Sequence, residues 1–261
     1  MGSASGRFLL SLLFLSLFFN ALSQSLIEML PEHRRSGHRL ILRDDNLFCD
    51  SWRFSVETND AGFWKTIPQR CLRFVQDYMT DERYQSDLKV VATDSLEFAK
   101  SVELAGDGKD AWIFDIDETL LSNLPYYEVH GFGSETFDER TFDDWIDLAE
   151  APAILASLSL YKELKQMGFK VILLTGRSEP QRNVTSKNLL FAGYSDWERL
   201  ILRGHSDQGT LATVYKSAKR KEIEDEGYRI HGSSGDQWSD LVGCAIARRS
   251  FKLPNPMYYV A

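Results

Sequence analysis

The chain has 261 residues, of which 43% are hydrophobic and 26% are charged, a composition that is typical of a globular protein and excludes a disordered or fibrous chain. Its formal net charge of -8, without any long lysine or arginine run, argues against a nucleic-acid or anionic-membrane partner, because such partners bind clustered positive charge. A small anionic substrate would therefore need a local positive site.

The N-terminal segment 1–23 has the features of a secretory signal peptide. Arg7 precedes an apolar run over residues 8–22, and the small residues Ala21 and Ser23 stand where a signal peptidase would cleave. The run is shorter than the ~20 residues that a membrane-spanning helix needs, although a membrane anchor that tethers a binding module stays open as an alternative. We expect a protein of the secretory pathway, extracellular or vacuolar, with no membrane partner after signal removal.

The cysteines fit that compartment, because paired thiols are oxidised outside the cytosol. Cys49 and Cys71 form the simplest pair, and a disulfide between them would stabilise the fold by roughly 3 kcal/mol. We expect Cys244 to be a small buried apolar residue, and the cysteine spacing matches no zinc site. Asn183 begins an Asn-Val-Thr sequon, which predicts glycosylation if its side chain is exposed.

The first part of the mature chain, residues 24–109, has little strand character. Residues 24–62 lack helical periodicity and predict an irregular, partly extended arm. Apolar residues then recur at helical spacing between Pro68 and Tyr78, and again over residues 88–102. This part is therefore predicted to be an arm followed by a helical extension.

From residue 110 onward, short apolar runs alternate with amphipathic segments. Strands that are buried on both faces and alternate with helices predict an α/β fold with a Rossmann-like parallel sheet flanked by helices. Each intervening helix ends at a glycine, which suits a helix C-terminus. The predicted strands are AWIFDI, FKVILLT, RLILR and YRIHGS, and the predicted helices cover residues 151–168, 179–193 and 214–227.

Polar side chains follow the predicted strands at their carboxyl ends, where ligands bind in open parallel sheets. One hydroxyl, one ammonium and four carboxylates are expected to converge there. Asp115 and Asp117 follow the first strand, and Thr175, Gly176 and Arg177 follow the second. Lys216 opens the helix after the third strand, and Asp236 and Asp240 follow the fourth strand.

This set of groups suits phosphoryl transfer assisted by Mg²⁺, a hard cation that binds oxygen ligands and substrate phosphate. Asp115, Asp117, Asp236 and Asp240 are the candidate metal ligands, with Asp115 and Asp236 as the direct ones and Asp240 acting directly or through water. The substrate is expected to be a small phosphate ester.

The two aspartates of the Asp-x-Asp pair have separate expected roles. Asp115 would attack phosphorus and form an aspartyl-phosphate, and Asp117 would protonate the leaving oxygen and later accept a proton from water. Lys216, the Thr175 hydroxyl and backbone donors at Gly176 would bind the phosphoryl oxygens. An isolated Asp-x-Asp can also simply cap a turn, but several matched groups at one edge favour an active site.

The motifs DIDET, LLTGR, the lysine of VYKS and GDQWSD resemble the four motifs of the haloacid dehalogenase superfamily of phosphohydrolases. CDSW, GDQWSDLVG and FKLPNPMYY resemble the plant class B acid phosphatases and vegetative storage proteins, over residues 44–261. The resemblance implies a Mg²⁺-dependent acid phosphatase, secreted or vacuolar, with a homodimer as a possible assembly. It favours Lys216 over its basic neighbours Lys219, Arg220 and Lys221. Whether Arg177 contacts substrate or pairs with a neighbour stays open.

The resemblance also implies a small or absent cap, which matches an aromatic insert at about 122–150. The catalytic core would then be residues 110–261, and the insert would shape the mouth of the site. The alternative function is a vegetative storage protein with weak or incidental phosphatase activity. In storage members the nucleophilic aspartate can be replaced, whereas Asp115 is intact here, which favours the enzyme.

Overall fold

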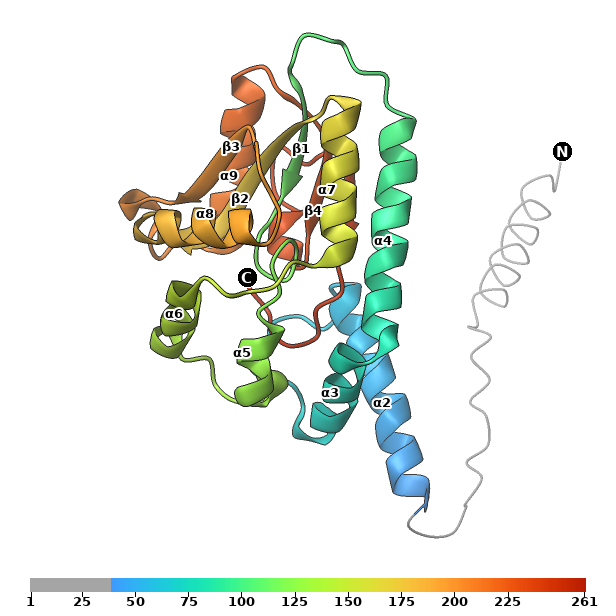
Figure 1. Ribbon diagram of the computed structural model, residues 1–261. Coiled ribbons are helices and arrows are strands. Elements are labelled where there is room, and N and C mark those ends of the chain that lie inside the picture. Colours follow the sequence, from blue (N-terminus) through green and yellow to red (C-terminus); the bar gives the residue numbers. More distant parts are fainter. Residues whose placement is uncertain (1–38) are drawn as a thin grey trace, which may run out of the picture. The chain divides into compact units, whose positions relative to one another are not determined.

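A computed structural model describes residues 39–261, and its centre is a sheet of five parallel strands in the order β3-β2-β1-β4-β5 (Figure 1). The predicted parallel α/β architecture is therefore confirmed. The fifth strand, a short edge strand, was not predicted. The strands are β1 Asp110–Phe114, β2 Lys170–Ser178, β3 Arg199–Arg203, β4 Arg229–Gly235 and β5 Arg249–Lys252.

Three helices connect the strands, and each ends near a glycine as predicted. They are α7 Leu155–Met167, α8 Arg182–Phe191 and α9 Ala212–Asp225. The glycines that follow, Gly168, Gly193 and Gly227, have φ angles of 101°, 94° and 88°. Because glycine lacks Cβ, it adopts this left-handed conformation without steric cost and lets the chain turn back into the next strand.

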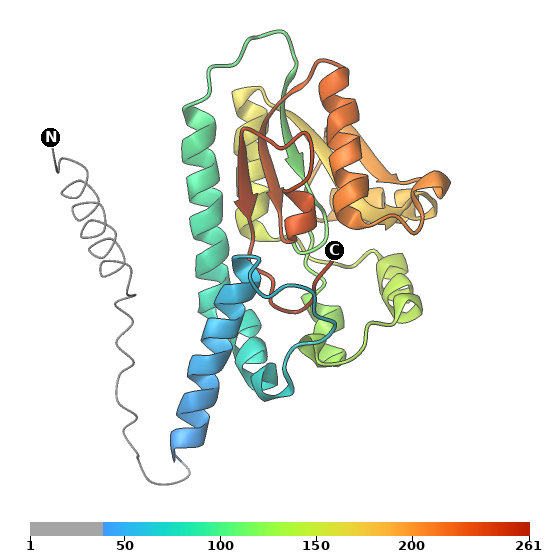
Figure 2. The same ribbon diagram turned by 180° about the vertical axis from the view of Figure 1, so that it is seen from behind.

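The central strands β1, β2 and β4 are buried on both faces, with successive side chains pointing to opposite sides of the sheet. Trp112 and Phe114 lie in the apolar core shared with α7, α8 and α4 (Glu82–Lys100), whereas Ile113 packs on the α9 side. The indole of Trp112 lies directly on the backbone of Gly232 in β4, where an added Cβ would be 2.4 Å from the ring. Figure 1 shows α4 beside α7, and Figure 2 shows α4 along the β5 edge.

The N-terminal part differs from the expectation. Instead of an irregular arm, residues 39–57 form helix α2 (Arg39–Glu57), so that prediction is wrong for the described residues. Cys49 and Val56 form its buried side, while Leu47 and Phe54 are exposed. The predicted helical extension is present as α3 (Leu72–Thr80) and α4. The predicted signal peptide lies outside the described residues.

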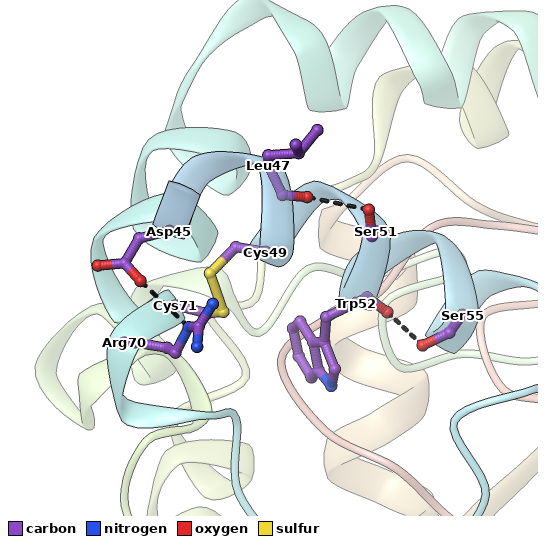
Figure 3. Close-up of a disulfide and its surroundings, with 8 residues drawn as sticks. All are labelled: Asp45, Leu47, Cys49, Ser51, Trp52, Ser55, Arg70 and Cys71. Carbon is purple, nitrogen blue, oxygen red and sulfur yellow. Dashed lines mark hydrogen bonds and ion pairs between the residues drawn. A yellow bond between two sulfur atoms is a disulfide. The ribbon is translucent and has the colours of Figure 1, made fainter. Parts of the chain in front are cut away.

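The predicted disulfide joins Cys49 of α2 to Cys71, the last residue of the short helix η1 (Gln69–Cys71), with a Cα–Cα distance of 5.4 Å (Figure 3). An ion pair between Arg70 and Asp45, 3.2 Å long, lies beside it. Cys244, expected to be buried, is instead exposed.

The insert after β1 is helical and small. It consists of α5 (Leu124–Val129), η2 (Gly131–Gly133) and α6 (Glu139–Leu148). Its aromatic side chains pack together, with the rings of Tyr126 and Phe142 5.1 Å apart. Among the described residues, no helix combines the length and the apolar character that crossing a membrane requires.

Candidate active site

The carboxyl ends of β1 and β4 bring the predicted aspartates together. Asp115 follows β1 directly, and its backbone N–H donates to the carbonyl of Ser234 in β4, 3.0 Å away. The Thr119 hydroxyl then joins the two loops, because it accepts from the Asp236 backbone N–H at 3.1 Å and lies 3.3 Å from the Asp236 carboxylate. The loop after the first strand is thus attached to the loop after the fourth.

Three carboxylates form a buried cluster. Oxygen atoms of Asp115, Asp236 and Asp240 all lie within 4.8 Å of one another. Asp240 comes this close to β4 because the preceding strand ends in Gly235, where an added Cβ would lie 2.4 Å from the Cβ of Asp240. A buried group of three oxygen donors at this spacing can hold a divalent metal ion.

Lys216 supplies the positive charge next to this cluster. Its Nζ lies 2.6 Å from Asp115 Oδ1 and also donates to Asp240. Burial alone would lower the pKa of Lys216, but Asp115 and Asp240 more than offset this and raise it above its ordinary value. Burial, followed by the charge of Asp240, raises the pKa of Asp115, and the same two causes raise the pKa of Asp236 to about 6. Three carboxylates facing one ammonium leave an excess of buried negative charge that favours a bound cation.

The alternatives to Lys216 on α9 are engaged elsewhere. Arg220 donates to three backbone carbonyls, including those of Asp240 and Ala245. Lys219 and Lys221 pair with acidic residues of their own helix. Of these four basic residues, Lys216 is the one whose side chain contacts the carboxylates of the aspartate cluster.

Asp117 is not part of this three-carboxylate cluster and pairs with Arg177 instead. The guanidinium Nη2 lies 2.7 Å from Asp117 Oδ1, and Nε lies 3.1 Å from Oδ2. Asn123 Nδ2 also donates to Asp117 at 2.9 Å. Burial by itself would raise the pKa of Asp117, but Arg177 and Asn123 lower it below its usual range. Arg177 thus pairs with Asp117 in this structure, and whether it also contacts substrate stays a prediction.

Thr175 and Gly176 stand at the same edge of the sheet but differ in exposure. The Thr175 hydroxyl is buried and accepts a hydrogen bond from the Arg177 backbone N–H at 3.1 Å. Gly176 is exposed and lines a cavity of about 640 Å³ together with Asp117 and Arg177. Arg203 from β3 also lines this cavity, as do Phe137 and Phe142, so its wall is partly charged and partly aromatic.

The predicted glycosylation site lies on α8. Asn183 is exposed, as a sequon requires, but the hydroxyl of its Thr185 is buried and accepts from Arg177 Nη1 at 3.2 Å. Thr185 therefore also supports the Arg177–Asp117 pair. Glycosylation of Asn183 stays a prediction.

Sequence reasoning missed the residues that hold Asp236. Asn255 Nδ2 and Gln237 Nε2 donate to Asp236 Oδ2 at 2.8 and 2.7 Å. The backbone N–H of Asn255 in turn donates to Glu57 at the end of α2, 3.0 Å away, and Lys252 Nζ pairs with the same carboxylate at 2.7 Å. The first helix and the C-terminal segment are thus both connected to the carboxylate cluster.

Glu118 was also missed, although it lies inside the DIDET motif. It is buried, has a φ angle of 50° and accepts hydrogen bonds from the Asn123 backbone N–H at 2.5 Å and from the Tyr258 hydroxyl. Burial first, and then the charges of Asp236 and Asp117, raise its pKa to about 8. The available signal was an acidic residue within the otherwise apolar run that follows Asp117.

A second cavity, of about 480 Å³, also borders Asp117, and most of the residues that line it are aromatic. Trp64 and Phe63 come from the segment before η1, Tyr127 comes from the insert, and Tyr258 comes from the C-terminal segment. Asp117 therefore borders both a cavity with charged and aromatic walls and a mostly aromatic one.

The comparisons with known proteins agree on one family. The family model described as HAD superfamily, subfamily IIIB (Acid phosphatase) matches residues 34–261. Acid phosphatase 1 from Solanum lycopersicum is 55% identical over 83% of this chain and 85% of its own length. Vegetative storage protein 2 from Arabidopsis thaliana is 40% identical over 81% of this chain and 80% of its own length. Among solved structures, the class C acid phosphatase from Bacillus anthracis has the same fold, with a TM-score of 0.59, 22% identity, and coverage of 84% and 86% of the two chains.

Proposed function

Since the chain belongs to subfamily IIIB of the HAD superfamily, the acid phosphatases, we propose that it hydrolyses small phosphate monoesters through an aspartyl-phosphate on Asp115. One observation carries this proposal. Asp115 lies buried at the end of β1, 2.6 Å from the Lys216 ammonium and within 4.8 Å of Asp236 and Asp240. A nucleophilic carboxylate needs nearby positive charge, because an anionic phosphate must approach it.

The donor set fits Mg²⁺, which prefers oxygen ligands and accepts only one or two direct carboxylates beside water and substrate phosphate. Asp115 and Asp236 would hold the ion, with Asp240 bound directly or through water. When bound, the ion withdraws charge from the phosphoryl oxygens. Asp117 was also a candidate ligand, but its carboxylate is engaged by Arg177, so we assign it to proton transfer instead.

The protein groups divide the reaction between them. The Asp115 carboxylate attacks phosphorus while the bond to the leaving oxygen breaks, and Asp117 donates a proton to that oxygen. Asp117 then accepts a proton from the water that attacks the aspartyl-phosphate, which releases inorganic phosphate and restores the Asp115 carboxylate and the protonated Asp117 carboxyl group. Lys216, the Thr175 hydroxyl and the Gly176 backbone would bind the phosphoryl oxygens, where negative charge increases during transfer.

A storage role can coexist with this activity. The 40% identity to vegetative storage protein 2 supports that second role, while the intact Asp115 supports catalysis. We place the mature protein in the secretory pathway, extracellular or vacuolar, which the Cys49–Cys71 disulfide supports because such bonds persist in oxidising compartments. A homodimer stays a prediction.

The test is to trap the intermediate. Purified protein with Mg²⁺ is screened against phosphate esters, and the reaction with a radiolabelled ester is quenched in acid and mapped by peptide sequencing. We expect the label on the peptide that contains Asp115 and none in Asp115→Asn. Asp94→Asn, which changes an exposed carboxylate on α4, serves as the matched control and should be labelled like the wild type. Turnover that survives in Asp115→Asn would show that the nucleophile is another group.

A further inference from the structure

The disulfide closes a segment, residues 49–71, whose middle part reaches the active site. Between the end of α2 and the start of η1 this segment has no regular secondary structure. Phe63 and Trp64 from this stretch line the aromatic cavity that borders Asp117. The N-terminal extension therefore contributes to a cavity beside Asp117.

We propose that the disulfide-closed segment 49–71 is a specificity element, in which Phe63 and Trp64 form the wall that packs against an aromatic leaving group. The proposal deepens the proposed function and rests on it, because it assigns the substrate class to phosphate monoesters of alcohols that carry a flat, apolar ring.

The position of Asp117 supports this direction for the leaving group. A proton donor must lie within hydrogen-bonding reach of the oxygen that it protonates, so the leaving group extends from the phosphate past Asp117. Two cavities border Asp117, so the leaving group has two directions in which to extend. The two cavities share Phe137 and Phe142, but the larger one also carries Arg177 and Arg203, whose charged groups would lose solvation against an apolar ring. The other offers the faces and edges of Trp64, Tyr127 and Tyr258, against which aromatic rings pack favourably.

A hydrogen bond and aromatic contacts hold the middle of the segment, and the disulfide joins its end to α2. The Ile67 backbone N–H donates to the Gly133 carbonyl of the insert at 3.0 Å. The ring of Trp64 lies edge-on to Trp52 of α2, with centroids 5.5 Å apart, and Phe63 lies edge-on to Tyr259 at 5.9 Å. Trp52 lies on α2 next to the bridged Cys49 (Figure 3). Loss of the disulfide would therefore free one end of the wall from the helix that supports it.

The experiment compares two substrates whose leaving oxygens are chemically alike. Both 2-phenylethyl phosphate and ethyl phosphate release a primary alcohol, so the ratio of their kcat/KM values reports the ring and not the leaving-group chemistry. We expect the wild type to prefer the phenylethyl ester by about tenfold, as one or two favourable aromatic contacts provide. Trp64→Ala and Phe63→Ala should each reduce that ratio severalfold. Phe191→Ala removes an aromatic ring that is 83% exposed on α8 and should leave the ratio unchanged.

Binding measurements separate this inference from the proposed function. Calorimetric titration of Asp115→Asn with each ester measures the preference for the ring without any turnover. If neither ester is hydrolysed, the proposed function fails, while the binding ratio still decides the inference. Equal binding of the two esters would overturn the inference, and so would a binding preference that survives Phe63→Ala. Phe63 is chosen because its side chain is 70% exposed and, unlike Trp64, has little part in folding.

The disulfide is tested by the same ratio. We expect the paired change Cys49→Ser and Cys71→Ser to lower the preference for 2-phenylethyl phosphate severalfold and to change kcat/KM for ethyl phosphate much less. A ratio equal to that of the wild type would show that the disulfide does not position the wall.

Discussion

Replacing Arg177 with methionine should move the pH dependence of catalysis toward higher pH. Arg177 holds Asp117 in its charged form through contacts of 2.7 and 3.1 Å, and it thereby lowers the pKa of the group that must give up a proton to the leaving oxygen. Methionine has a similar length and no charge. In Arg177→Met, burial is no longer offset by the guanidinium, so the pKa of Asp117 rises.

The magnitude follows from the geometry. An opposite charge within about 4 to 6 Å lowers a carboxyl pKa by about 1 to 3 units, and each unit corresponds to about 1.4 kcal/mol. Removing that charge therefore raises the pKa of Asp117, because burial is then no longer offset. Because the proton donor must be protonated, a higher pKa keeps it active to a higher pH. The falling alkaline limb of the rate should shift upward by the same amount.

The assay must isolate the step in which Asp117 acts as an acid. Rapid-quench measurement of phosphoenzyme formation from ethyl phosphate, followed from pH 4 to pH 9, does so, because the alkoxide leaving group requires a proton. Arg177→Lys is the matched control, since it retains the positive charge and should leave the limb close to that of the wild type. A limb that is unchanged in Arg177→Met, or that moves to lower pH, would refute the assignment of Asp117 as the acid.

The same pair has a consequence for stability. A carboxyl whose folded pKa is depressed stabilises the fold above its unfolded pKa, and this stability is lost as the pH falls through the folded value. Arg177→Met should therefore lower the free energy of unfolding at neutral pH, by up to about 3 to 5 kcal/mol if Asp117 stays charged. The difference from the wild type should shrink as the pH falls toward the lowered pKa of Asp117, because protonation removes the charge that Arg177 pairs with. Denaturant unfolding at pH 7 and at pH 3 measures it.

Three further outcomes are expected. Exhaustive chelation should abolish turnover and Mg²⁺ should restore it, because the aspartate cluster carries more negative than positive charge; full activity in chelator would contradict a metal site there. Asp117→Asn should still be phosphorylated by p-nitrophenyl phosphate, whose leaving group needs little protonation, but should accumulate the intermediate, as quench-flow labelling would reveal; rapid hydrolysis would exclude Asp117 as the base. Breaking the Cys49–Cys71 bond, which spans 22 residues, should cost about 3 kcal/mol in the free energy of unfolding, and equal stability with and without reductant would contradict this estimate.

The sheet was predictable because its strands are buried on both faces and read as continuous apolar runs. The short strand β5 was not, since Phe251 is its one buried residue and four residues give no usable pattern. Helix α2 was missed for a different reason. Its buried residues Cys49 and Val56 have helical spacing, but the exposed Leu47 and Phe54 obscure the apolar stripe.

The site shows the same division. Asp115 and Asp236 were predictable as neighbours, because the carboxyl ends of parallel strands meet at one edge of a sheet. The pairing of Arg177 with Asp117 and the contact of Asn255 with Asp236 were not, since both depend on how loops distant in sequence fold over that edge. Side-chain direction in such loops is a tertiary property that periodicity does not encode.

The contacts of the C-terminal segment bear on when activity arises during synthesis. Asn255, which orients Asp236, and Tyr258, which binds Glu118, are translated about 140 residues after Asp115 and Glu118, so they emerge from the ribosome well after β1 has been made. At a translation rate of about 5 to 20 residues per second, that interval lasts roughly 7 to 30 s. A nascent chain can therefore form most of its sheet while the cluster still lacks these contacts, and hydrolytic activity would appear only after Asn255 and Tyr258 have emerged.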